Sequence, residues 1–297
     1  MSQKTRKEKD SLGSISVLNS NLWGAQTQRS IKNFKIGNEK MPIEIIYALT
    51  IVKMSCAKAN LKQKLLSPKI ANAISYAAKQ ILTHKYNDHF PLSVWQTGSG
   101  TQTNMNVNEV IANIANKKLT GKLGTNSPVH PNDHVNKSQS TNDSFPTAMN
   151  IATSMKLIHE LIPALKAIEK TLKSQSLKWN SLIKIGRTHL QDATPISLGQ
   201  EFSGYSAQIS TNIKRASNSL GNILSLAQGG TAVGTGLNTK RNFDKLVVSE
   251  IAKVTKIKFR PSNNKYQSLA SHDAIVEVSG VINTIATDLF KIANDIR

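Results

Sequence analysis

The residues best suited to chemistry lie at positions 184–195, which read Lys-Ile-Gly-Arg-Thr-His-Leu-Gln-Asp-Ala-Thr-Pro. In this run a hydroxyl, Thr188, stands next to a titratable imidazole, His189, and an amide and a carboxylate follow closely. Such a set can hold a small polar substrate and transfer a proton. A solvent-facing loop would tolerate the same composition, so the run alone leaves both interpretations open.

Two other polar runs, at positions 97–104 and 130–143, have the same character. In the first, Gly98 and Gly100 allow a tight turn. A helix that starts after this turn would present free N–H groups, which suit a carboxylate. Three such runs on one helical scaffold predict one composite site.

Apolar residues recur at helical intervals between these runs. The spacing predicts helices over 43–65, 67–83, 105–119, 144–179, 198–226, 243–254 and 271–297. Residues 1–40 are expected to be irregular, with 22–30 as a packed, hydrogen-bonded connection. Asp143 or Ser144 is expected to cap the fourth helix and Pro146 to lie in its first turn.

The composition indicates a globular protein built mostly from aliphatic helices, with 39% hydrophobic and 5% aromatic residues. No apolar run is long enough to cross a bilayer. The single cysteine, Cys56, excludes a disulfide framework, and its apolar neighbours favour buried packing. The basic N-terminus lacks the apolar segment of a secretory signal, so we expect a cytoplasmic protein with no membrane partner.

The formal net charge of +20 is compatible with a nucleic-acid partner. However, the lysines are scattered along the helical segments, and aromatic residues do not alternate with them as a base-stacking surface requires. We therefore expect no nucleic-acid partner. A diffuse positive field would instead help to attract dianionic substrates.

The pattern predicts a mainly α fold with two domains, at residues 1–138 and 139–297. The second would be a bundle of long antiparallel helices joined by polar loops. Long helices of this kind usually pack against other subunits, so an oligomer is expected.

The chain resembles the class II fumarate hydratases of the fumarase/aspartase superfamily over essentially its whole length. The matching runs are at positions 9–13, 22–30, 95–106, 130–133, 186–195 and 229–238. Aspartase is the nearest competitor, and it resembles this chain in the Ser-Thr-Asn-Asp run at 140–143. Fumarases have histidine at position 189, where aspartases typically have glutamine, so His189 favours fumarase.

The resemblance implies a fumarase/aspartase-like N-terminal domain, a long-helix bundle, a homotetramer, and reversible, cofactor-free and metal-free hydration of fumarate to L-malate. It implies that His189 is the acid/base residue, acting through a bound water. The substrate-binding residues implied are Ser99, Gly100, Thr101, Ser140, Thr141, Asn142 and Thr188. A secondary dicarboxylate site is implied at His130, Pro131, Asn132 and Asp133, although Ser127 stands where the family has arginine.

The family also has a mobile loop, Gly-Ser-Ser-x-Met-Pro-x-Lys-x-Asn, which carries the catalytic base and a substrate-binding lysine. This loop is expected beyond residue 297, so the bundle is expected to be incomplete in this chain. Without the loop, activity is expected to fall by orders of magnitude. Two hypotheses follow: a second polypeptide supplies the loop, or the chain is a non-catalytic remnant that acts as an interaction module.

Overall fold

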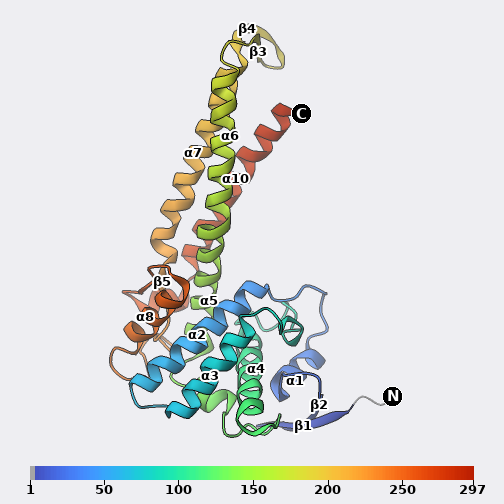
Figure 1. Ribbon diagram of the computed structural model, residues 1–297, viewed down its shortest axis with the longest axis vertical. Coiled ribbons are helices and arrows are strands. Elements are labelled where there is room, and N and C mark those ends of the chain that lie inside the picture. Colours follow the sequence, from blue (N-terminus) through green and yellow to red (C-terminus); the bar gives the residue numbers. More distant parts are fainter. Residues whose placement is uncertain (1–3) are drawn as a thin grey trace. The chain divides into compact units, whose positions relative to one another are not determined.

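The computed structural model describes residues 4–297, which form two compact units (Figure 1). Among the described residues, unit 1 covers 4–152 and Leu224–His272, and unit 2 covers Thr153–Ile223 and Asp273–Arg297. Most residues are helical, so the predicted mainly α fold is confirmed. The division into domains at residues 138 and 139 stays a prediction.

Unit 1 combines helices with short strand pairs. Its elements are β1 (Thr5–Asp10), β2 (Gly13–Leu18), α1 (Ala25–Asn33), α2 (Ile43–Lys62), α3 (Pro68–Ile81), η1 (Asn87–His89), α4 (Thr101–Thr120), η2 (Pro131–Val135), the larger part of α5 (Thr141–Lys156), β5 (Ser225–Leu226), α8 (Phe243–Thr255), β6 (Arg260–Pro261) and α9 (Lys265–Ala270).

Unit 2 contains long helices and one hairpin. Its elements are the end of α5, η3 (Leu157–Leu161), α6 (Ile162–Lys178), β3 (Ile183–Thr188), β4 (Gln191–Ser197), α7 (Leu198–Ile223) and α10 (Asp273–Ile296). The predicted long helices are therefore present in both units.

The expectation that residues 1–40 are irregular is wrong. Strands β1 and β2 pair antiparallel from Thr5↔Leu18 to Asp10↔Gly13. Within β2, Ile15 and Val17 are buried while Ser14 and Ser16 are exposed, which is the period-2 pattern of a half-buried strand. The hairpin was missed because this alternation covers only a few residues.

Residues 25–33 form helix α1, so the expected connection over 22–30 is also wrong. The helix starts where Glu109 of α4 accepts hydrogen bonds from the backbone N–H groups of Gly24, Gln26 and Thr27, at 2.9, 2.8 and 3.1 Å. A carboxylate from a distant part of the chain thus serves as the N-terminal cap. The sequence of residues 22–30 alone therefore does not indicate that a helix begins at Ala25.

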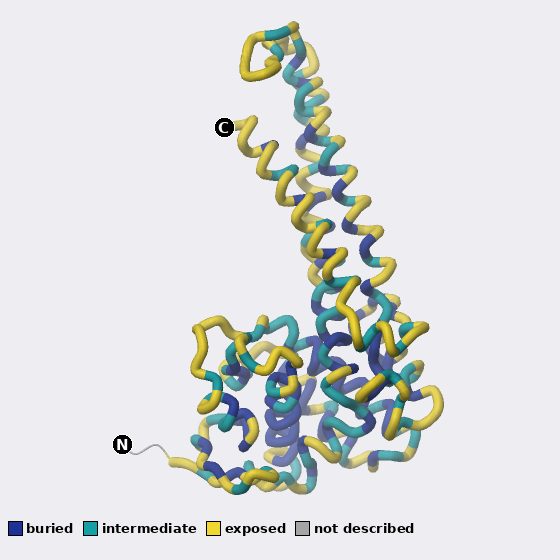
Figure 2. The backbone as a smooth tube through the Cα atoms, turned by 180° about the vertical axis from the view of Figure 1, so that it is seen from behind, coloured by how far each residue is buried: buried dark blue, intermediate teal, exposed yellow. Residues whose placement is uncertain are grey.

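Helices α2, α3 and α4 form the core of unit 1, visible as dark blue segments in Figure 2. Helix α2 is buried on nearly all sides, and Cys56 is buried within it as predicted. Alanines at positions such as Ala57 and Ala77 let the helices approach closely. The same helix carries Lys53, whose side chain is fully buried.

Glu250 ties α8 to α2 inside unit 1. Its carboxylate lies 2.7 Å from Lys62 Nζ, 3.0 Å from Lys253 Nζ and 3.5 Å from Lys58 Nζ. Burial would raise the pKa of Glu250, but the hydrogen bonds and charges of Lys62 and Lys253 outweigh it and hold the pKa at about 2.

We expect Glu250→Gln to lower the free energy of unfolding by about 1 kcal/mol at pH 7, since the three lysines are partly exposed. Because the folded-state pKa lies below the usual 4.5, this stabilisation is present above pH 4.5 and disappears as the pH falls towards about 2. Urea unfolding of both proteins across this range checks the prediction. A difference that stays constant with pH would contradict it.

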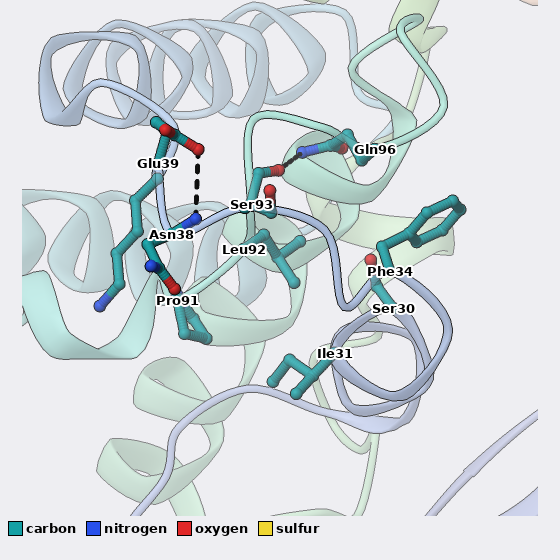
Figure 3. Close-up of a pocket in the computed structure, with 11 residues that line it drawn as sticks. Ser30, Ile31, Phe34, Asn38, Glu39, Pro91, Leu92, Ser93 and Gln96 are labelled. Carbon is teal, nitrogen blue, oxygen red and sulfur yellow. Dashed lines mark hydrogen bonds between the residues drawn. The ribbon is translucent and has the colours of Figure 1, made fainter.

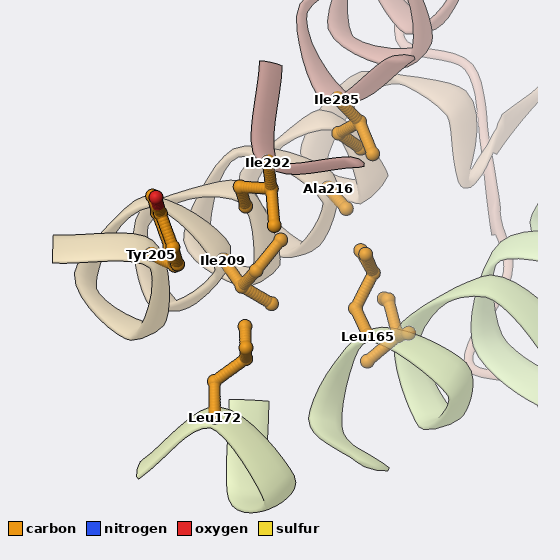
Figure 4. Close-up of a cluster of buried hydrophobic side chains, with 8 residues drawn as sticks. Leu165, Leu172, Tyr205, Ile209, Ala216, Ile285 and Ile292 are labelled. Carbon is orange, nitrogen blue, oxygen red and sulfur yellow. The ribbon is translucent and has the colours of Figure 1, made fainter. Parts of the chain in front are cut away.

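Unit 2 is held together by apolar side chains from α6, α7 and α10 (Figure 4). Leu165 and Leu172 of α6 meet Ile209 of α7, and Ile285 and Ile292 of α10 complete the cluster. These positions recur every third, fourth or seventh residue, as the helical pattern predicts. Other large apolar side chains on α10 are exposed: Val276, Ile282, Phe290 and Ile296.

The predicted helix over 144–179 is interrupted by the π-helical turn η3, between α5 and α6. Pro163 is the second residue of α6 and has no N–H to donate, so it suits the first turn of this helix. No helix within residues 4–297 is both long and apolar enough to span a membrane.

Candidate active site

Three hydroxyl groups lie together where α4 begins. Ser99 Oγ is 3.0 Å from Thr101 Oγ1 and 3.2 Å from Thr97 Oγ1, and Thr97 Oγ1 donates to Gln102 Oε1 at 2.6 Å. Thr101 is the first residue of α4, so these hydroxyls stand at the positive end of a helix dipole. The predicted helix begins earlier than expected, at residue 101 instead of 105.

The glycine turn before α4 has the geometry that the sequence predicts. Gly98 and Gly100 both have φ of +76°. At Gly100 a Cβ atom would lie 2.3 Å from the ring of Phe145, so no larger residue fits there. The close contact places the start of α4 against the first turns of α5.

The side chain of Gln96 holds the same turn through hydrogen bonds to the first turn of α4 and to Ser93. Its Oε1 accepts from Thr103 N at 3.0 Å, and its Nε2 donates to Thr103 Oγ1 at 2.8 Å and to Ser93 O at 2.9 Å. Figure 3 shows Gln96 and Ser93 at the wall of a pocket of about 200 Å³. Gln96 thus joins the first turn of α4 to Ser93 at the wall of this pocket.

Helix α5 begins at Thr141, three residues before the predicted start, and Ser140 precedes it. Ser140 Oγ accepts from Asn142 N at 3.2 Å, and Asp143 Oδ1 accepts from Ser140 N at 3.0 Å. This is a reciprocal cap, in which the third helical residue bonds back to the residue before the helix. The expected cap at Asp143 or Ser144 is wrong, because Asp143 acts from inside the helix.

Asp143 also holds the glycine-rich loop after β5. Its buried Oδ2 accepts from Gly229 N and Thr231 N, both at 2.9 Å, and from Gln228 Nε2 at 3.0 Å. Burial raises the pKa of Asp143 to about 6, while these backbone donors and the charge of Lys53 oppose the increase. One carboxylate therefore joins the start of α5 to residues 228–231.

Asn142 and Thr141 have partners from other elements. Asn142 Nδ2 donates to Ala232 O at 2.7 Å, and Thr141 Oγ1 accepts from Asn104 Nδ2 at 3.0 Å. Both of these predicted substrate-binding residues are therefore held in place by hydrogen bonds within unit 1.

An open pocket of about 710 Å³ brings several predicted residues together within unit 1. Thr101, Ser140 and Thr141 line it, and so do Asn132 and Asp133 from the predicted secondary site. Helices α4 and α5 both begin at this pocket, with Thr101 and Thr141 as their first residues. Two helix N-termini and several hydroxyl groups favour a ligand with negative charge.

The predicted secondary site is the π-helical turn η2. His130 Nδ1 accepts from Asn132 N at 3.3 Å and Asp133 N at 3.1 Å. The same Nδ1 also lies 3.3 Å from Asp133 Oδ2. His130, Pro131 and Asn132 line a second pocket of about 510 Å³, and Asn132 lines both pockets.

Thr188 and His189 belong to unit 2, where the expected polar loop is a β-hairpin. Strands β3 and β4 pair with Thr188 opposite Gln191, which leaves His189 and Leu190 as the two turn residues. Both have positive φ, +50° and +61°, as the favoured two-residue hairpin turn requires. Neither is glycine, so the exposed imidazole sits on a strained backbone.

The sequence did not single out Lys53, Asn104, Glu109 or Asn136, and it treated Asp143 only as a cap. Lys53 Nζ donates to Asn136 Oδ1 at 2.8 Å and to Gln139 Oε1 at 2.9 Å, behind the wall of the 710 Å³ pocket. Burial lowers the pKa of Lys53 to about 8, and the nearby carboxylate of Asp143 opposes this. The available signal was a lysine inside the mostly apolar stretch at positions 45–57 of α2.

Comparison with known proteins gives the family. A family profile described as Lyase matches residues 13–297, and the chain belongs to this family. It is 57% identical over 292 residues to a class II fumarate hydratase of Rickettsia bellii, and 56% identical over 293 residues to one of Caulobacter vibrioides. These alignments cover 98% and 99% of this chain and 63% of each relative.

Solved structures agree. A class II fumarase from Schistosoma mansoni has a TM-score of 0.95 at 41% identity, over 98% of this chain and 64% of that one. A fumarate lyase:delta crystallin from Brucella melitensis has a TM-score of 0.93 at 35% identity, over 99% and 64%. The predicted fold and resemblance are confirmed, and the chain spans about 63% of the length of the curated relatives it matches.

Proposed function

We propose that this chain binds a four-carbon dicarboxylate and forms part of a fumarate hydratase, which interconverts fumarate and L-malate. The observation that carries the proposal is the pocket at which α4 and α5 begin, lined by Thr101, Ser140 and Thr141. Hydroxyl donors at helix N-termini suit carboxylates. The names of the longer relatives supply the substrate.

The proposed reaction removes a proton next to one carboxylate of malate and then expels hydroxide with the help of an acid. The charge that develops on the carboxylate is stabilised by the donors of residues 99–101 and 140–142. His189 is assigned the acid/base role, through a bound water, and Thr188 a donor role. Residues 130–133 are assigned a secondary dicarboxylate site.

The exposed apolar side chains of α10 support the proposal that the chain assembles with further protein. The partner is either other copies, in a homotetramer, or a polypeptide that carries the part of the relatives that this chain does not cover. Cytoplasmic location is proposed with the same function.

The test is the loss of fumarate absorbance, with malate measured independently. We expect malate to form much faster when the chain is mixed with the uncovered part of the Rickettsia bellii relative than with either alone, and His189→Asn to abolish the gain. Malate formation that His189→Asn leaves unchanged would contradict the assignment. Aspartate formation from fumarate and ammonia would instead favour the aspartase alternative, which the run at 140–143 suggests.

A further inference from the structure

A buried chain of amides connects Lys53 to the pocket. Four segments meet there: Lys53 comes from α2, Asn104 from α4, Asn136 from the end of η2, and Thr141 from the start of α5. Their side chains are joined by hydrogen bonds of 2.8 Å from Lys53 to Asn136, 3.3 Å from Asn104 to Asn136, and 3.0 Å from Asn104 to Thr141.

Lys53 determines how the amide of Asn136 is oriented. An ammonium group can only donate, so the atom of Asn136 that faces it must be the oxygen. The other end of this amide, Nδ2, donates to Gln139 O at 3.4 Å, which agrees with the same orientation. Asn136 therefore presents a carbonyl oxygen to Asn104.

Asn136 in turn determines the orientation of Asn104. The amide group that faces a carbonyl oxygen must donate, so Asn104 turns its Nδ2 towards Asn136 Oδ1. The second hydrogen of the same Nδ2 goes to Thr141 Oγ1. The opposite orientation would bring two carbonyl oxygens together and lose the bond to Asn136, and the Thr141 hydroxyl would then donate to Asn104 instead of accepting from it.

The hydrogen bond from Asn104 also determines the direction of the Thr141 hydroxyl hydrogen. Since Thr141 Oγ1 accepts from Asn104, its own hydrogen points away from that amide. Within residues 4–297 no acceptor for this hydrogen occurs, and Thr141 lines the 710 Å³ pocket. The hydroxyl is thus an available donor at the start of α5.

We infer that Asn104 is a positioning residue, which aligns the Thr141 hydroxyl as a donor to the substrate carboxylate. The inference rests on the proposed function, because it needs a carboxylate in the pocket. Asn104 itself is buried, and its Oδ1 has no partner in the described structure, so its contribution passes through its Nδ2. Lys53 keeps the chain of amides in this orientation.

A double-mutant cycle tests the inference. Titration calorimetry with L-malate is made on the wild-type chain, Asn104→Leu, Thr141→Val and the double variant. We expect each single variant to bind malate about tenfold more weakly, and the double variant to bind no more weakly than Thr141→Val alone. Losses that multiply in the double variant would overturn the inference.

Asn108→Leu is the matched control. Asn108 lies one turn further along α4 and also donates to Asn136 Oδ1 at 3.3 Å, but its other bond goes to Met105 Sδ at 3.4 Å and not to Thr141. The two leucine variants should lose similar stability, while Asn108→Leu keeps the malate affinity. An equal loss of affinity in both would show general loosening and would also overturn the inference.

A second measurement needs no ligand. In ¹⁵N-labelled protein, one side-chain amide proton of Asn104 should shift upfield in Thr141→Val, because it loses its acceptor. An unshifted signal would overturn the inference even if malate binds. A shifted signal together with no malate binding to the wild-type chain would instead reject the proposed function.

Discussion

Replacing Asp143 with alanine is expected to lower the free energy of unfolding by about 3–5 kcal/mol at pH 7. The carboxylate is fully buried and accepts from the backbone N–H groups of Ser140, Gly229 and Thr231. Alanine would leave these donors without their acceptor and would remove the negative charge of Asp143, which raises the pKa of Lys53. Urea unfolding followed by circular dichroism measures the loss, and a change below about 1 kcal/mol would contradict the proposed role.

The isosteric variant Asp143→Asn is the control, because it keeps the size of the side chain and removes its titration. The folded-state pKa of about 6 is above the usual 3.8, so protonation stabilises the fold below pH 3.8, and this stabilisation is lost as the pH rises through about 6. Between pH 4 and pH 7 the wild type should therefore lose about 2 kcal/mol relative to Asp143→Asn. Parallel pH profiles would show that Asp143 keeps an ordinary pKa.

Lys53→Met is expected to cost about 3 kcal/mol and to weaken malate binding as well. Methionine fills a similar volume, but Gln139 Oε1 and Asn136 Oδ1 lose the ammonium donor that faces them. Asn136 then keeps its longer bonds of 3.3, 3.3 and 3.4 Å to Asn104, Asn108 and Gln139 but loses its shortest one, so the donor direction of Thr141 is less firmly fixed. Unfolding in urea and calorimetry with malate measure the two effects.

Cys56→Ala is the matched control for Lys53→Met, since Cys56 is buried on the same helix and no side-chain hydrogen bond of this thiol occurs within residues 4–297. It should lose about 1 kcal/mol of stability and retain its malate affinity. If Lys53→Met binds malate as tightly as Cys56→Ala does, Lys53 has no part in arranging the pocket.

The long helices could be predicted because their apolar residues repeat over many turns, and α2, α7 and α10 lie close to their predicted limits. Helix α1 could not be predicted, because the residue that caps its N-terminus, Glu109, is far away in the sequence. The hairpin at 183–197 was also missed. Polar residues occupy most of positions 187–194, and the turn uses His189 and Leu190 instead of the glycine or asparagine that signals such a turn.

Some residues of the candidate site could likewise be predicted from the sequence, and others could not. Hydroxyl and amide residues in short runs, such as Thr101 and Thr141, are conspicuous in the sequence, and the structure places both at one pocket. Lys53, Asn104 and Asn136 are distant from one another in sequence and have ordinary neighbours. Their relation depends on which atoms face each other after folding, and no spacing rule contains that information.

Calorimetric titration of the purified chain with L-malate tests the central claim most directly. We expect saturable binding of malate and fumarate that Thr101→Val and Thr141→Val each weaken about tenfold, with the folded state unchanged by circular dichroism. Absence of binding, or binding that neither substitution weakens, would contradict the claim that the pocket at the start of α4 and α5 holds a dicarboxylate.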